Sequence, residues 1–214
     1  MRTVDMINKK ILGWIKVISF SFIICHLSFS LSACSENTDE SQEYADWQLR
    51  NDVFFDSLED SLAAAPAVWK KFKSYAKDQS LAKGENTDCI YVKVLETGTD
   101  TENPMATDSV RVSYEGRLIP SATYPNGYVF DTRAYGTYEL STSATSRFLA
   151  SNNIEGFTTA LLHMHRGDQW RVYIPYALGY GATQSNKIPA YSTLIFQMSL
   201  IDFAPVGTVM PAWN

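Results

Sequence analysis

The strongest constraint on the fold is a change of hydrophobic period within the C-terminal half of the chain. Four segments alternate apolar and polar side chains, the two-residue period of β-strands: residues 89–96, 109–116, 169–175 and 192–203. One segment between the second and the third has helical spacing instead: Ile154, Phe157, Leu161 and Met164. Strands with a single helix before the last two indicate an α+β fold, in which one curved antiparallel sheet wraps around one short helix.

An N-terminal helical segment is expected before the sheet. Residues 44–62 place Trp47, Phe54 and Leu58 at near-helical spacing. A second helix is predicted over 66–77, because Pro66 is a favoured residue in the first turn of a helix. Both helices could pack on the following domain or pair with a second copy of the chain as a homodimer. Neither carries the repeated heptads of a long coiled coil.

The first 33 residues have the features of a lipoprotein signal peptide. A positive region with Lys9, Lys10 and Lys16 precedes an apolar run over 17–31, which is short for a membrane span. The sequence LSAC then ends at Cys34 and resembles the lipobox of bacterial lipoproteins. This resemblance implies cleavage before Cys34 and a lipid anchor on it, in the cell envelope. The alternative is an ordinary signal peptide followed by a chance cysteine.

The cysteine content and the charge argue against a disulfide-stabilised protein and against a nucleic-acid-binding protein. After cleavage only Cys34 and Cys89 remain, so no disulfide is expected if Cys34 carries lipid. Residues 35–60 contain nine acidic residues and one basic residue, Arg50. The acidic segment predicts either a solvated tether or a signal for export to the cell surface, and placement on the periplasmic or the outer face stays open. Nothing in the sequence has the basic patch of a nucleic-acid-binding protein.

The stretch VYIPYALGYG, residues 172–181, raises a question of chemistry. An apolar strand runs into a turn rich in tyrosine and glycine, without His, Cys or a carboxylate. A site built there would lack the His, Cys and carboxylate groups that most often serve as acid, base or nucleophile. The pair His163 and His165 does not supply a metal site, because alternate residues on a helix point apart and no third ligand is near in the sequence.

Five motifs together resemble the FK506-binding-protein family, the FKBP-type peptidyl-prolyl cis–trans isomerases. They are VSYEGRL, VFDT, IEGFTTALLHMHRGD, YIPYALGYG and KIPAYSTLIFQMSLID, beginning at residues 112, 129, 154, 173 and 187. Each motif is weak alone, but all five stand in order and near the spacing of the family. The chain then divides into a signal peptide (1–33), an acidic tether with the helical segment and first strand (34–105), an isomerase domain (106–204) and a tail (205–214).

The resemblance answers the question raised by residues 172–181. Rotation about an X–Pro bond needs no proton transfer and no cofactor, since its barrier of about 18–20 kcal/mol comes from amide resonance. The twisted amide is less polar than the planar one, so an apolar, water-poor pocket favours the transition state. Proline-containing polypeptides are the implied clients, and FK506-like macrolides the implied inhibitors.

Site residues follow from the resemblance, position by position. The apolar box for the proline ring would be formed by five side chains: Tyr114, Phe130, Phe157, Ile188 and Phe196. Asp131 matches the single carboxylate of the family's pocket and would polarise the bound amide. The hydroxyl of Tyr180 and the backbone N–H of Ile154 would hold substrate carbonyl groups.

The sequence departs from the family pattern at several positions. Phe157 stands where the family usually has Trp, and only Phe148 represents the aromatic residues of the strand before the helix. These departures favour an alternative of a different class, a catalytically weak binding module or chaperone that holds client chains at the membrane. Retention of Tyr114, Phe130, Asp131 and Tyr180 favours the enzyme, because a mere scaffold need not keep the polar groups of its pocket. All five motifs lie beyond residue 106, so a chain starting near Ser80 is expected to fold.

Overall fold

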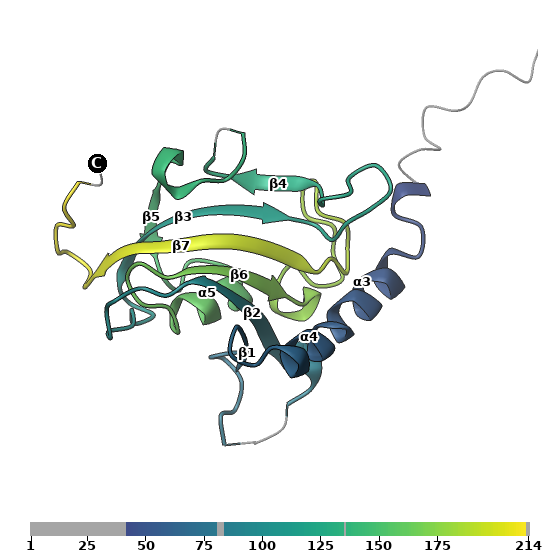
Figure 1. Cartoon of the computed structure of the whole chain (residues 1–214), viewed down its shortest axis with the longest axis horizontal. Coiled ribbons are helices and arrows are strands. Elements are labelled where there is room, and N and C mark those ends of the chain that lie inside the picture. The colour runs from purple at the N-terminus through teal and green to yellow at the C-terminus, as the bar shows by residue number, and fades with distance from the viewer. Residues whose placement is uncertain (1–41, 81–83, 135, 213–214) are drawn as a thin grey trace, which may run out of the picture. The chain divides into compact units, whose positions relative to one another are not determined.

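The computed structural model describes residues 42–80, 84–134 and 136–212. The described residues from Glu43 onward form one compact unit, built on a seven-stranded antiparallel sheet (Figure 1). The strand order is β1-β2-β6-β7-β3-β4, with β5 paired to β3. The strands are β1 (Trp69–Lys73), β2 (Cys89–Glu96), β3 (Ser109–Arg117), β4 (Val129–Thr132), β5 (Ser146–Leu149), β6 (Gln169–Ile174) and β7 (Leu194–Ala204).

The core lies between one face of the sheet and the short helix α5 (Glu155–Leu161). Alternate residues of β7 point toward this helix and are at most 5% exposed: Leu194, Phe196, Met198 and Leu200. Three residues of α5 and the following turn meet them, namely Phe157, Leu161 and Met164, each at most 3% exposed. The predicted sheet wrapped around one helix, with these faces inward, is confirmed.

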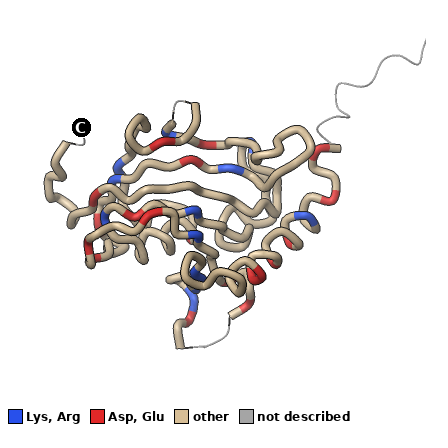
Figure 2. Tube along the Cα trace, in the orientation of Figure 1, with Lys and Arg blue, Asp and Glu red and all other residues tan. Residues whose placement is uncertain are grey.

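A second layer covers the other face of the sheet near β1, β2 and β6. It consists of α3 (Trp47–Asp56) and α4 (Leu58–Ala64), as Figure 1 shows. Phe55 and Leu58 from these helices bury Tyr91 of β2 and Tyr173 of β6. Figure 2 shows acidic residues along the two helices, among which Arg50 is the one basic residue. The helices therefore pack on the sheet with an apolar side and present charge to solvent.

The helix predicted over 66–77 is wrong, because residues 69–73 form β1. This strand pairs with the edge of β2, with Trp69 opposite Lys93 and Phe72 opposite Ile90. The ring of Trp69 stacks on Tyr173 on one face of the sheet, whereas Phe72 stacks on Trp170 on the other. The two apolar residues, three apart in the sequence, thus lie on opposite faces of the strand, and each packs on an aromatic ring of β6. The local sequence is compatible with a helix or with a strand, and pairing with the edge of β2 selects the strand.

Several expectations concern residues at or beyond the limits of the described structure. The signal peptide, Cys34 and the start of the acidic segment lie outside the described residues. Within the described residues, no helix is long and apolar enough to cross a bilayer, and no group of three or more His, Cys, Asp or Glu is placed to hold a metal ion. Cys89 is a buried free thiol in β2.

Candidate active site

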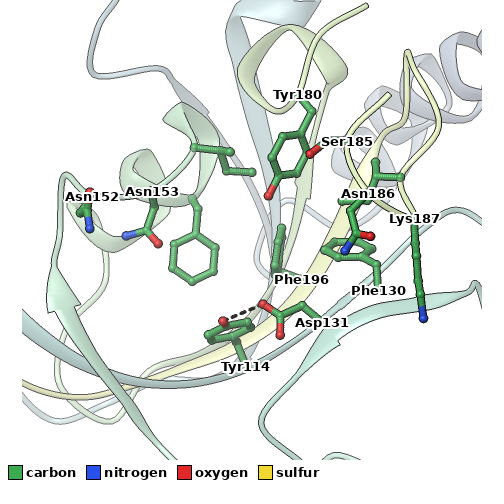
Figure 3. A pocket seen from close by; sticks show the side chains of 13 residues that line it. Tyr114, Phe130, Asp131, Asn152, Asn153, Tyr180, Ser185, Asn186, Lys187 and Phe196 are labelled. Carbon is green, nitrogen blue, oxygen red and sulfur yellow. Dashed lines mark hydrogen bonds between the residues drawn. The ribbon is translucent and has the colours of Figure 1, made fainter. Parts of the chain in front are cut away.

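A cavity of about 450 Å³ opens where α5, β3, β4 and the loop before β7 meet. It brings together residues from five separate parts of the chain: β3, β4, α5 with the turn before it, the 180–188 loop and β7 (Figure 3). All eight residues expected to bind or turn over substrate line this cavity: Tyr114, Phe130, Asp131, Ile154, Phe157, Tyr180, Ile188 and Phe196.

Aromatic rings form the apolar part of the cavity, each packed edge to face on its neighbour. Phe196 lies at the centre, with ring centroids 5.1 Å from Phe157, 5.5 Å from Phe130 and 6.1 Å from Tyr114. Such contacts hold each ring in one orientation. Gly116 of β3 makes room for this group, because a Cβ there would lie 2.6 Å from Phe130 and 2.7 Å from Phe196.

A short chain of hydrogen bonds forms the polar part of the cavity. The hydroxyl of Tyr114 donates to Oδ2 of Asp131 at 2.8 Å and accepts from the guanidinium of Arg133 at 3.1 Å. The Arg133 guanidinium also lies 5.3 Å from the centre of the Tyr114 ring. Burial raises the pKa of Tyr114, so its hydroxyl keeps the proton that it donates to Asp131.

Tyr180 faces this pair from the other side of the cavity. Its hydroxyl points into the open space between α5 and the loop that carries Asn186, as Figure 3 shows. The side chain is 41% exposed, and burial together with the charge of Asp131 raises its pKa. The protonated hydroxyl is therefore placed to donate a hydrogen bond to a group inside the cavity.

The sequence reasoning missed the polar rim of the cavity. Five further residues line it, from the turns before α5 and before β7: Asn152, Asn153, Ser185, Asn186 and Lys187. The second turn is a tight hairpin, in which Ser185 and Ile188 exchange two backbone hydrogen bonds of 2.9 Å. Asn186 takes a positive φ of 52° at its tip. The SNK sequence between GATQ and IPA was the available signal, because asparagine tolerates this conformation.

Comparison with known proteins adds to this geometry. Residues 100–201 match the family described as FKBP-type peptidyl-prolyl cis-trans isomerase. Residues 100–201 are a domain of this family. The match begins close to the predicted domain start at residue 106 and spans all the strands and loops that line the FKBP cavity.

Several curated relatives match a larger part of the chain. The "Macrophage infectivity potentiator" of Trypanosoma cruzi is 35% identical over 114 residues, 53% of this chain and 52% of that protein. FkpA of Escherichia coli K12 is 30% identical over 149 residues, 69% of this chain and 50% of FkpA. The crystal structure of E. coli FkpA has 22% identity and a TM-score of 0.50, covering 86% of this chain and 82% of that one. The chain spans about half the length of these curated relatives.

Two departures from the FKBP pattern have visible consequences in the cavity. Phe157 provides the floor in place of Trp, at 3% exposure, and contacts Tyr114 with ring centroids 5.6 Å apart. Phe148 of β5 pairs with Val110 and packs on Phe157 from behind, with centroids 6.2 Å apart. The strand aromatic therefore supports the floor without lining the cavity itself.

Proposed function

We propose that the protein is a peptidyl-prolyl cis–trans isomerase that accelerates rotation about X–Pro bonds in exported or envelope proteins. The observation that carries this proposal is the joining of an aromatic box with one hydrogen-bonded carboxylate in a single cavity. The proline ring enters the space among Phe130, Phe157 and Phe196. Ile188 closes one side of the box and Ile154 lies beside it.

Catalysis follows from the difference between the planar and the twisted amide. The planar amide has strong resonance and a polar carbonyl that water stabilises, whereas the twisted amide has lost resonance. Transfer into an apolar cavity disfavours the planar form more than the twisted one, which lowers the barrier. Asp131 faces the amide, and its orientation is fixed by Tyr114. Tyr180 and the backbone N–H of Ile154 hold the flanking carbonyl groups, so the bond rotates within a fixed chain.

An exchange assay by NMR on a short X–Pro peptide tests this proposal. The parent should accelerate cis–trans exchange, and Phe130→Ala should abolish most of the acceleration because water enters the opened box. Asp131→Leu should reduce the rate less and leave the fold intact. FK506, a macrolide shaped to fill this kind of cavity, should bind the parent more tightly than Phe130→Ala. Parent-like rates in folded forms of both variants, or an inactive folded parent, would favour the binding-module alternative.

Placement in the cell envelope by a lipid on Cys34 is part of the same proposal. It rests on the apolar run and the LSAC sequence. Expressed in a bacterial host, Cys34→Ser should lose lipid label and membrane fractionation, whereas Cys89→Ser should keep both. A Cys34→Ser protein that labels and fractionates like the parent would exclude the anchor.

If the N-terminal helices form a dimer, we propose that the exposed side of α3 makes the contact, because Phe55 on its other side is already buried within the chain.

A further inference from the structure

The loop that forms one wall of the cavity is tied to the N-terminal helix α3 by buried hydrogen bonds. Nε1 of Trp47 donates to Oγ of Ser192 at 2.8 Å, and this hydroxyl donates to the carbonyl of Pro189 at 2.7 Å. Pro189 directly follows Ile188, which lines the cavity. Two hydrogen bonds therefore connect α3 to the backbone beside a cavity residue.

Asn51, one helical turn further along α3, provides a second connection. Its side-chain carbonyl accepts the backbone N–H of Thr193 at 2.7 Å, and its amide donates to the carbonyl of Trp47 at 2.7 Å. Asn51 is 0% exposed and Trp47 is 6% exposed. The loop partners Ser192 and Thr193 are 3% and 1% exposed. Because water does not reach this network, a missing partner leaves a polar group unsatisfied, and the loop is held in one position.

The exposed side of α3 makes no such contacts. Leu49 and Val53 are each 63% exposed on the same helix. The polar residues that contact the loop are thus confined to the buried side. The loop itself contains two residues with positive φ, Asn186 and Tyr191, and unlike asparagine, tyrosine rarely adopts this conformation.

We propose that Trp47 and Asn51 are positioning residues for the cavity, which hold the 185–193 loop so that Ile188 closes the proline box. The inference rests on the proposed isomerase function for its catalytic consequence, but the positioning itself is a property of the fold. It assigns to the segment before the family domain a role in substrate binding, beyond its part in the core.

Amide hydrogen exchange on the full folded chain tests the positioning without reference to activity. In Trp47→Phe and in Ser192→Ala, the amides of Ser185, Ile188 and Thr193 should exchange about two- to tenfold faster, the equivalent of one hydrogen bond. Amides at the centre of β3 and β7 should keep their rates, which separates a local from a global effect. Leu49→Ala is the matched control on the exposed side of α3 and should change none of these rates.

A double variant sharpens the test. If Trp47 acts through Ser192, Trp47→Phe combined with Ser192→Ala should exchange little faster than either single variant, whereas independent effects would multiply. Asn51→Leu should act most strongly on the Thr193 amide. Unchanged loop exchange in Trp47→Phe and Asn51→Leu, or multiplying effects in the double variant, would overturn the proposal.

The catalytic consequence has its own readout. In the same variants the KM for a short X–Pro peptide should rise about two- to tenfold with kcat nearly unchanged, because the box binds the ring less well while Asp131 and Tyr180 stay in place. Faster loop exchange with an unchanged KM would refute the role in substrate binding. A parent without isomerase activity would refute the proposed function, and the exchange data would still decide whether α3 positions the loop.

Discussion

The hydroxyl of Tyr114 lies 2.8 Å from Oδ2 of Asp131 and also accepts a hydrogen bond from the guanidinium of Arg133. Tyr114 therefore links the cationic guanidinium of Arg133 to the carboxylate of Asp131 at the edge of an apolar cavity. Asp131 is exposed, so its orientation depends on this one donor more than on packing.

Tyr114→Phe should therefore lower kcat/KM for a short X–Pro peptide about two- to tenfold, because Asp131 loses the hydrogen bond that orients it. The ring keeps its contacts with Phe157 and Phe196, so any fall in melting temperature should reflect only the two lost hydrogen bonds, to Asp131 and from Arg133. Tyr124→Phe, an exposed ring outside the cavity, is the control. Full activity in Tyr114→Phe would show that Asp131 needs no positioning by this hydroxyl.

Tyr180→Phe should give a similar two- to tenfold decrease in kcat/KM, for a different reason. Its hydroxyl faces the open cavity, so the lost bond is one made to substrate rather than to the protein. The free energy of unfolding should then be unchanged, which can be measured by urea denaturation beside the rate. A decrease in stability without a decrease in rate would contradict this assignment.

Gly116→Ala should impair the cavity without touching a polar group. The new methyl would lie within 2.7 Å of both Phe130 and Phe196, so at least one ring must move. Overpacking of this kind costs about 1–3 kcal/mol of stability. Binding of FK506, measured by calorimetry, should weaken by about tenfold or more, because the displaced ring enters the box. Unchanged affinity would mean that the rings yield outward instead.

Much of this fold could be predicted from the sequence, because the inner faces of β3 and β7 follow a strict two-residue period. The prediction was incomplete at β2, where alternation implies one buried face with Ile90 and Val92 and one exposed face with Tyr91. In fact Tyr91 is 0% exposed, since α3 and α4 cover the outer face. Alternation is a signal for one buried face, and it carries no information about a second layer supplied by a distant segment.

The cavity residues were found by motif, but the residues that hold them were not. Trp47 and Asn51 lie 145 and 142 residues before their partners in the sequence. No local pattern connects positions so far apart, and without the fold an asparagine in an amphipathic helix is read as exposed. The polar rim at Asn152 and Asn186 was missed for a related reason, since a polar turn is the usual composition of any loop.

The same distant contacts revise the expectation that a chain starting near Ser80 folds. Such a chain loses β1 and the burial of Trp47, Phe55 and Leu58, each worth about 1.5–3 kcal/mol. That loss is comparable with the whole stability of a domain, about 5–15 kcal/mol, and it also exposes the edge of β2. We expect no cooperative thermal transition by circular dichroism, whereas a chain starting at Gln42 should melt like the full protein. A Ser80 chain with the parent melting temperature would show that the N-terminal segment only docks on a self-sufficient domain.

Alkaline pH should destabilise the protein through its buried tyrosines. Burial raises the pKa of Tyr173, so above pH 10 the unfolded chain loses this proton while the folded chain keeps it. The unfolded state then binds fewer protons than the folded state, and the free energy of unfolding falls as pH rises. Each such tyrosine contributes at most about 1.4 kcal/mol per pH unit above pH 10 and nothing below pH 9.

Tyr173→Phe keeps the ring stacked on Trp69 and should make the decrease between pH 10 and 11 shallower, as measured by urea denaturation at a series of pH values. Tyr124→Phe, with an exposed ring, is the matched control for removal of a hydroxyl. Equal slopes for Tyr173→Phe and the parent would show that this hydroxyl ionises alike in the folded and unfolded chain.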